Sequence, residues 1–373
     1  MKDTGIWKKI SVISFLLFLS VFSITNILLT DKEVSSTERR RMEQLPEFSL
    51  ESLLDGEYGG KLEEYLLDQF AGRDFFRTIK TEFETIVMGK SDSNAYFMVG
   101  DSIYKLNAEL EEKNVVWAAN QFSTIRRELF PEAQAYYAII PDRNYFLKEE
   151  SGMAYPTMDY ERLNALMKEN MQDFSYINLY GCLELEDYYQ TDLHWRQEKI
   201  ADAADTLLES MQSSGLQMEY YEQKVATDNF LGGYAAASAF LVKPEELNYL
   251  TSSVIEQAVV YDYEKKEMVS IYAPERLEGM DPYDFYLWGA RALLTIKNPE
   301  QENGKKLIIF RDSFGSSIAP LLLEKYSEIT LVDLRYISAN YMDTLIDTSE
   351  YDTVLFLYST ELLNNSDSLK PYR

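Results

Sequence analysis

The longest run of the chain without a charged side chain lies near its start, from residue 10 to residue 30. In a helix, this run is long enough to cross a hydrocarbon core of roughly 30 Å. Lys2, Lys8 and Lys9 precede the run. The positive-inside rule places the short N-terminus in the cytoplasm and the rest of the chain outside, although the arginines at 39–41 oppose this assignment. No small-x-small cleavage site follows, so the pattern predicts an uncleaved signal-anchor; a cleaved signal peptide is the alternative, with the same compartment. We therefore expect a single-pass protein of the cell membrane whose C-terminal domain is extracytoplasmic.

After the apolar run, the pattern becomes polar and then helical. Residues 31–48 are mostly polar or charged and include Pro46, which is typical of a stalk. Apolar residues then recur at helical spacing from Leu53 to Phe70, interrupted by glycines, and a second helix is predicted over 75–88. The pattern divides the chain into an anchor over 1–30, a stalk and helical lead-in over 31–90, and a main domain over 91–373.

Short apolar runs alternate with helical patterns in the main domain. The predicted strands are 135–140, 175–179, 307–310, 329–332 and 354–357, and the predicted helices are 115–129, 160–171, 195–211 and 318–326. Between about 216 and 290 the alternation is less regular, and we assign this segment to an insertion that contains a hairpin of 257–263 and 267–272. Alternating strands and helices predict an α/β fold, with a parallel sheet flanked by helices and ligands at the carboxyl ends of the strands.

The composition narrows the classes of partner. The chain has 373 residues, of which 46% are hydrophobic, so it can bury a large core. Its 62 acidic and 36 basic residues give a net charge of −26, which repels phosphate backbones and anionic lipid surfaces, and we expect no nucleic-acid partner. Aromatic residues make up 14% of the chain, with 28 Tyr, which suits stacking on sugar rings as well as ordinary core packing.

One cysteine and one histidine limit metal chemistry. Cys182 has no partner for an intrachain disulfide, and it follows an apolar stretch, where a small buried hydrophobe is expected. A Cys/His zinc site and the mixed His/Asp site of a metal-dependent deacetylase both need more such ligands than this sequence offers. We therefore expect no metal and no cofactor.

Ser313 lies where a strand meets a helix. The predicted strand 307–310 runs directly into Arg311, Asp312 and Ser313, and Phe314 and Gly315 follow at the start of the next helix. Such a turn exposes a serine hydroxyl, while backbone N–H groups at the helix start can hold an oxyanion. Gly315 would allow the backbone to approach closely. Serine and glycine are also ordinary capping residues, so this pattern alone leaves both interpretations open.

The second candidate segment contains the single histidine. A serine hydroxyl needs a base within about 3 Å, and His194 is the only imidazole in the chain. Asp192 lies two residues before it, and in an extended chain both side chains point to one side, so the carboxylate can bind the other ring nitrogen. Alternatively, Asp192 caps a helix that begins near Trp195, and His194 is merely exposed.

Together the two segments resemble those of a known family. The sequence Asp-Leu-His-Trp at 192–195 is similar to the DHHW motif of the bacterial DHHW family, and Arg-Asp-Ser-Phe-Gly at 311–315 is similar to its later D-S-[FY] motif. Leu193 replaces the first histidine of the family motif, but this position points away from the Asp192–His194 pair in an extended chain. The DHHW family is related to the SGNH-like domains of alginate O-acetyltransferases.

The resemblance implies a fold, a site and a reaction. The implied fold is SGNH-hydrolase-like, with a flavodoxin-like parallel sheet flanked by helices and a small inserted β region. In the implied site Ser313 is the nucleophile, His194 the general base and Asp192 its orienting carboxylate. The implied reaction is O-acetylation of a cell-surface or exported polysaccharide through an acetyl-serine, with a multispanning membrane acyltransferase as acetyl donor. The alternatives are a carbohydrate acetylesterase with the same triad and a non-catalytic, membrane-anchored carbohydrate-binding or assembly protein.

Other residues allow more than one interpretation. Gly232, Gly233 and Tyr234 could form a substrate or oxyanion loop or an ordinary turn. Arg311 could meet substrate or hold the turn before Ser313. Tyr336 and Tyr358 follow predicted strands and could border the cleft or pack in the core.

Overall fold

The chain folds into two compact units. The computed structural model describes residues 4–35, 37–151, 156–301 and 303–372, so Lys2 lies outside the described residues. The smaller unit comprises residues 1–93 and 236–241, and the larger unit comprises 94–235 and 242–373. The elements of the smaller unit are α1 (Thr4–Leu28), β1 (Val34–Ser35), β2 (Arg40–Arg41), α2 (Leu50–Leu54), α3 (Glu57–Asp68), α4 (Arg73–Glu82) and the π-helix η1 (Phe83–Val87).

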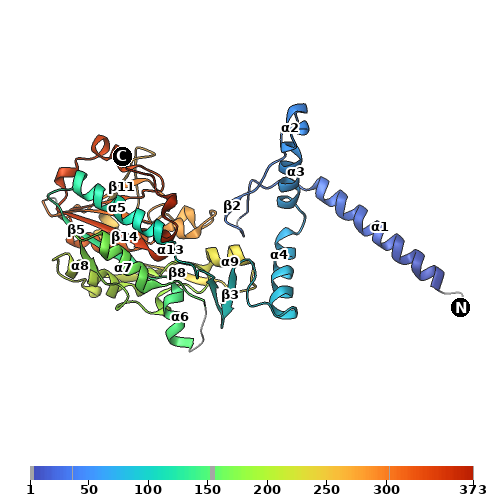
Figure 1. Ribbon diagram of the computed structural model, residues 1–373, viewed down its shortest axis with the longest axis horizontal. Helices are drawn as coiled ribbons and strands as arrows, with labels where there is room; N and C mark the ends of the chain where they lie inside the picture. The colour runs from blue at the N-terminus through green and yellow to red at the C-terminus, as the bar shows by residue number, and fades with distance from the viewer. Residues whose placement is uncertain (1–3, 36, 152–155, 302, 373) are drawn as a thin grey trace. The chain divides into compact units, whose positions relative to one another are not determined.

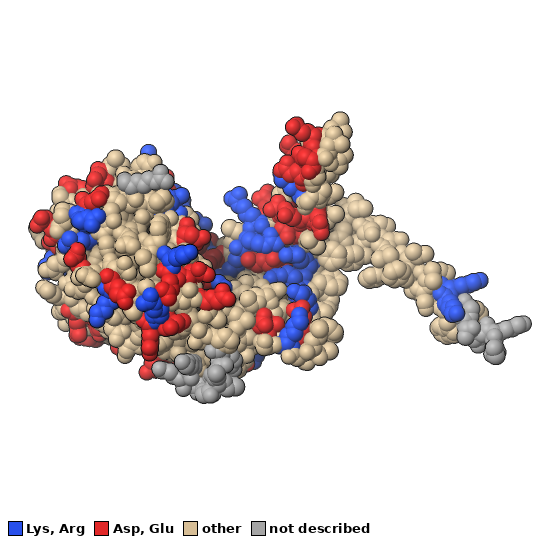
Figure 2. Space-filling view, in the orientation of Figure 1, with Lys and Arg blue, Asp and Glu red and all other residues tan. Residues whose placement is uncertain are grey.

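Helix α1 confirms the predicted N-terminal apolar helix. Residues 6–28 form a helix long and apolar enough to cross a membrane. Figure 2 shows it as an uncharged rod with basic side chains only near its N-terminal end. Its use as an anchor and the side on which the chain lies stay predictions.

The lead-in after the stalk is broken where the sequence carries glycine. The predicted helix over 53–70 is interrupted at Gly56, whose φ of +86° suits glycine, and the chain continues as α3. An ion cluster then fixes the stalk to these helices. Asp68 accepts two hydrogen bonds from the Arg40 guanidinium, at 2.7 and 2.6 Å, and Arg73 at the start of α4 donates to Glu38 at 2.7 Å. The hydrogen bonds from Arg40 lower the pKa of Asp68 to about 2.

The larger unit contains an eight-stranded sheet in the order β10-β9-β11-β13-β12-β14-β5-β6. Its strands are β5 (Gln134–Ile140), β6 (Ser175–Ile177), β9 (Val259–Asp262), β10 (Glu267–Val269), β11 (Leu293–Lys297), β12 (Lys306–Arg311), β13 (Glu328–Val332) and β14 (Thr353–Ser359). The five strands from β13 to β6 are parallel, which confirms the predicted parallel sheet. The sheet as a whole is mixed, because β11, β9 and β10 pair antiparallel at one edge. The predicted hairpin is thus β9–β10, and it extends the main sheet, whereas β11 is a short strand that the pattern did not predict.

Helices cover both faces of this sheet (Figure 1). The helices of the larger unit are α5 (Glu112–Leu129), α6 (Arg143–Ser151), α7 (Tyr160–Asn170), α8 (Ala201–Ser210), α9 (Gly233–Ser238, which runs into the smaller unit), α10 (Ser253–Gln257), α11 (Gly315–Leu322), α12 (Met342–Leu345) and α13 (Thr360–Asn364). The larger unit also contains two separate two-stranded antiparallel sheets: β3 (Tyr96–Val99) with β4 (Ser102–Lys105), and β7 (Glu222–Phe230) with β8 (Glu245–Thr251).

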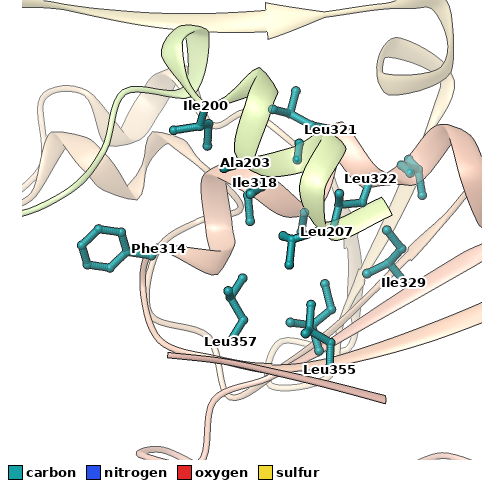
Figure 3. Packing of buried hydrophobic residues seen from close by; sticks show 14 of the residues in the cluster. Ile200, Ala203, Leu207, Phe314, Ile318, Leu321, Leu322, Ile329, Leu355 and Leu357 are labelled. Carbon is teal, nitrogen blue, oxygen red and sulfur yellow. The ribbon is translucent and has the colours of Figure 1, made fainter. Parts of the chain in front are cut away.

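Alternate residues of the central strands enter two separate cores. Ile309 of β12 and Leu355 of β14 belong to the core under α8 and α11, whereas Ile308 and Val354 belong to the core under α5, α7 and α13. Figure 3 shows the first core, where the labelled side chains are Ile200, Ala203, Leu207, Phe314, Ile318, Leu321, Leu322, Ile329, Leu355 and Leu357. This period of two is expected for strands buried on both faces.

The neighbouring strands β12 and β14 send the chain to opposite faces of the sheet. After β12 the chain enters α11, whose Leu321 lies in the first core, and after β14 it enters α13, whose Leu363 lies in the second. Divergence of this kind opens a crevice at the carboxyl ends of two parallel strands. Ser313 lies two residues after the end of β12 and therefore at this crevice.

Candidate active site

A cleft of about 670 Å³ opens in the larger unit at the carboxyl ends of β12 and β14. Ser313 and Phe314 line it from the turn after β12, Ser316 lines it from the start of α11, and Ser359 lines it from the end of β14. His194 lines it from a separate loop. The cleft is thus in the place that the sheet topology predicts for a ligand.

The structure brings Ser313, His194 and Asp192 together. His194 Nε2 lies 2.7 Å from Ser313 Oγ, and His194 Nδ1 lies 2.6 Å from Asp192 Oδ1. With the proton on Nδ1, the ring donates to the carboxylate and accepts from the serine hydroxyl. Asp192 is fully buried, His194 is 4% exposed and Ser313 is half-buried, so the chain of hydrogen bonds runs from the interior to the cleft.

The alternative interpretation of Asp192 as a helix cap is wrong. The helix predicted from residue 195 begins only at Ala201, in α8, after a short 3-10 turn. Tyr188 and Trp195 instead form a β-bridge, and the Tyr189 N–H donates to the His194 carbonyl at 3.1 Å. The Asp192 carboxylate also accepts the His194 backbone N–H at 3.0 Å, which fixes the extended turn between them.

The loop at 232–234 holds the Asp192 carboxylate. The Gly233 N–H donates to Asp192 Oδ2 at 2.5 Å, and the Gly232 N–H donates to Thr191 Oγ1 at 2.9 Å. Tyr234 donates its N–H to the Thr191 carbonyl at 3.1 Å, and its side chain lines the cleft beside Tyr96, with ring centroids 5.4 Å apart. This loop therefore positions the carboxylate, and a contact between Tyr234 and substrate stays a prediction.

Gly232→Ala is expected to disrupt this arrangement. A Cβ at residue 232 would lie 2.2 Å from the Thr191 carbonyl oxygen and 2.4 Å from Asp192 Cβ, so the backbone around Asp192 would have to move. We expect a loss of about 1–3 kcal/mol of unfolding free energy, typical of overpacking. The rate of ester hydrolysis should fall by more than the lower unfolding free energy explains, because the Asp192 carboxylate is displaced. Thermal unfolding and ester hydrolysis measure the two effects. Gly181→Ala is the control, because its Cβ would meet only Asn178 Nδ2, at 3.8 Å; equal effects of the two variants would contradict the expectation.

Tyr283 is a site residue that the sequence pattern did not single out. Its ring stacks on the His194 imidazole, with centroids 3.8 Å apart and an interplanar angle of 6°. Its hydroxyl donates to Ser317 Oγ at 2.8 Å, and Trp195 Nε1 donates to the same oxygen at 2.7 Å. Burial raises the pKa of Tyr283 far above its ordinary value, so the hydroxyl stays protonated and keeps this bond. Tyr283 lies in the irregular segment assigned to the insertion, where no periodicity marked it.

The turn after β12 is held by Asp312. Its Oδ1 accepts the Phe314 N–H at 3.1 Å, and its Oδ2 accepts the Ser359 N–H at 2.8 Å, which ties the ends of β12 and β14 together. The Gly315 N–H donates to the Asp312 carbonyl at 3.1 Å. Binding of an oxyanion by the Phe314 and Gly315 N–H groups stays a prediction. It requires each N–H either to donate to the oxyanion and to Asp312 at once or to give up its hydrogen bond to Asp312. The Phe314 ring lies against His194, with centroids 4.9 Å apart.

Arg311 supports the turn after β12 from within the protein interior. It is fully buried, donates to the carbonyls of Asp312 and Gly289 at 3.3 and 3.4 Å, and lies 3.6 Å from Asp333 Oδ2. Burial lowers the pKa of Arg311, and the Asp333 carboxylate opposes this shift. Arg311 is not among the residues that line the cleft, so its position does not support the proposed contact with substrate. Tyr358 is likewise buried in the core, whereas Tyr336 lines the cleft and is 48% exposed.

The cleft carries more acidic than basic side chains. Its basic residues are Lys105 and Arg335, and its acidic residues are Asp281, Asp284, Asp312, Glu361 and Asp367. Both basic groups also pair with a carboxylate, Lys105 with Glu361 and Arg335 with Asp333. Burial disfavours the charged form of Lys105, but the Glu361 carboxylate outweighs it and raises the pKa of this amine. Among the described residues, no group of three or more His, Cys, Asp or Glu side chains is placed to hold a metal ion.

The fold and the site define an α/β protein with a mixed, largely parallel sheet and a Ser–His–Asp arrangement at the carboxyl ends of its strands. No family model matches the chain, and no curated protein sequence matches it. Among solved structures, it is similar to a DHHW family protein from Eubacterium siraeum, with 19% identity, a TM-score of 0.63 and coverage of 74% of this chain and 94% of that chain. Bacillus cereus PatB1 with a sulfonyl adduct is also similar, with 17% identity, a TM-score of 0.59 and coverage of 72% and 95%. The O-acetyltransferase domain of Pseudomonas putida AlgJ matches with 12% identity, a TM-score of 0.45 and coverage of 71% and 90%. The predicted resemblance to the DHHW family is confirmed at the level of the fold.

Proposed function

We propose that the chain is an extracytoplasmic O-acetyltransferase that acts on a polysaccharide through Ser313, His194 and Asp192. The observation that carries this proposal is the unbroken chain of hydrogen bonds from Asp192 through His194 to Ser313 at a cleft. A serine activated in this way attacks acyl carbonyl groups. The acetyl group and the polysaccharide come from the motif resemblance, and the ring of Tyr336 at the cleft offers a face on which a sugar can stack.

The reaction has two balanced halves. In the first, Ser313 Oγ bonds to the carbonyl carbon of an acetyl ester while its proton passes to His194 Nε2. The bond from that carbon to the donor oxygen then breaks, and His194 returns the proton to the departing alcohol. In the second half, a sugar hydroxyl gives its proton to His194 and attacks the acetyl-serine, which releases the O-acetylated sugar and restores the Ser313 hydroxyl. Asp192 remains ionised throughout and stabilises the imidazolium.

The apolar helix α1 suggests where the protein acts in the cell. An apolar α1 in the membrane would hold the larger unit at the outer face, where exported polysaccharides pass. A multispanning membrane acyltransferase is the proposed acetyl donor, because an acetyl group that originates in the cytoplasm must cross the bilayer.

The charge of the cleft points to a neutral or amino-bearing acceptor. Five acidic side chains against two basic ones line it, so a polymer of uronic acids would meet like charge. The hydroxyl groups and ammonium groups of a sugar are not repelled by these carboxylates.

Trapping the acyl-enzyme tests the proposal. The full chain in detergent is mixed with p-nitrophenyl acetate and quenched, and its peptides are analysed by mass spectrometry. We expect one acetyl group on the peptide that contains Ser313, and we expect a sulfonyl fluoride to block its formation. A neutral or amino-bearing polysaccharide should accelerate p-nitrophenol release and become acetylated, whereas a polyuronate should not. Acetylation of Ser313 without transfer to any sugar would favour the acetylesterase, and absence of acetyl-serine would overturn the proposal.

A further inference from the structure

We infer that the apolar face of α4 and η1 lies in the outer interfacial layer of the same membrane that α1 crosses. The inference rests on the proposed insertion of α1 and is independent of the proposed chemistry. All the residues involved belong to the smaller unit.

Aromatic contacts join this region to the apolar helix. The ring of Phe22 in α1 lies 4.9 Å from that of Phe70 and 6.5 Å from that of Phe76, centroid to centroid. Phe22 lies well before the end of the apolar stretch at Leu28, and the difference amounts to about 9 Å along a helix. If α1 spans the bilayer, Phe70 and Phe76 therefore lie at the depth of the outer leaflet.

A polar side chain of α1 shows the same association. Asn26 lies within the apolar stretch, where an amide without hydrogen-bond partners is strongly disfavoured in lipid. Its Nδ2 donates to the Phe22 carbonyl at 2.9 Å, and its Oδ1 accepts the Ala71 backbone N–H at 2.8 Å. The chain at residue 71 thus satisfies an amide at membrane depth.

The helix that follows is amphipathic. Its exposed apolar side chains are Phe75 (64% exposed), Phe76 (44%), Ile79 (45%), Phe83 (51%), Ile86 (73%) and Val87 (68%). The opposite face is covered by residues 236–241, because Thr81 Oγ1 donates to the Ser238 carbonyl at 2.8 Å and Arg77 donates to the Ala236 carbonyl at 2.9 Å. One face of the helix therefore bonds to the protein, and the other exposes aromatic and branched apolar side chains, as interfacial helices do. A hydrophobic face of this size beside a membrane span fits a lipid surface.

Depth-dependent quenching tests the inference on the full chain in phosphatidylcholine nanodiscs. In a Cys182→Ser background, single cysteines replace Ile86, Glu63 or Val12 and carry an environment-sensitive fluorophore. Glu63 is an exposed polar position of the smaller unit, and Val12 lies in α1. We expect the label at residue 86 to be quenched by lipids with nitroxide on the acyl chain several-fold more than the label at 63, and by aqueous iodide several-fold less.

Each other outcome overturns the inference. Equal iodide quenching at 86 and 63 would place the face in water. Protection of 86 from both iodide and nitroxide lipids would mean that protein covers it, whether the larger unit or a partner. Lipid quenching at residue 12 alone would keep the anchor and reject the docked face. Hydrolysis of p-nitrophenyl acetate by the same samples reports separately on the proposed function.

Discussion

Ser313→Ala is expected to lower the rate of p-nitrophenyl acetate hydrolysis by about 10³-fold or more, because it removes the proposed nucleophile. The Ser313 hydroxyl bonds His194 Nε2 at the cleft, and no other serine of the described residues bonds this nitrogen. The substitution deletes a single half-buried oxygen, so the thermal unfolding midpoint should stay within a few degrees. Initial rates of p-nitrophenol release measure the effect.

Ser214→Ala provides the matched control for this experiment. Ser214 is exposed and is not among the residues that line the cleft, so its loss should leave the rate unchanged. Equal rates of p-nitrophenol release for Ser313→Ala and the wild type would contradict the proposed enzymatic function and favour a carbohydrate-binding or assembly protein.

Asp192→Asn is expected to lower the same rate by roughly 10⁴-fold while the fold is retained. The carboxamide is nearly isosteric and can still accept the Gly233 N–H through its oxygen. At the Oδ1 position its NH₂ group cannot accept the His194 backbone N–H, so the variant should also lose about 1–3 kcal/mol of unfolding free energy. Its NH₂ group would then face His194 Nδ1 and favour the tautomer that carries the proton on Nε2. That tautomer cannot take the Ser313 proton.

Asp202→Asn is the control for the carboxylate. Asp202 is exposed on α8, so removal of its charge should change the rate less than twofold. If Asp192→Asn kept the wild-type rate, Asp192 would be only a structural partner of the 232–234 loop, and the triad would reduce to a dyad.

The strongest sequence signals lay where local chemistry and periodicity agree. The run over 307–310 and the turn at Ser313 were predicted as a strand and a strand-to-helix turn, because a buried parallel strand is continuously apolar. The apolar helix near the N-terminus was equally clear, because length and composition alone define it. The spacing of Asp192 and His194 allowed their contact but could not exclude a helix cap.

The remaining features depend on contacts between distant segments. The stacking of Tyr283 on His194 joins residues far apart in the sequence, and no local pattern encodes it. Strand β11 is too short to be separated from other apolar runs, and its antiparallel pairing with β13 is decided by the sheet. The contact of Arg311 with Asp333 could not be predicted from the sequence either, because an arginine at the end of a strand can point into the core or into the cleft.

The long segment between the two motifs has a consequence for how the protein folds. Ser313 and His194 are 119 residues apart, and Gly233, in the segment between them, is 41 residues from the carboxylate that it holds. Closing such long loops costs chain entropy before any contact repays it. The sheet closes a still longer loop, because β14 pairs with β5, with Thr353 opposite Gln134. The crevice that holds Ser313 exists only once β12 and β14 are paired, so the three segments are expected to meet only after the central sheet has formed. During refolding, recovery of ester hydrolysis should lag behind recovery of secondary structure, so the site itself serves as a reporter for the last stage of folding.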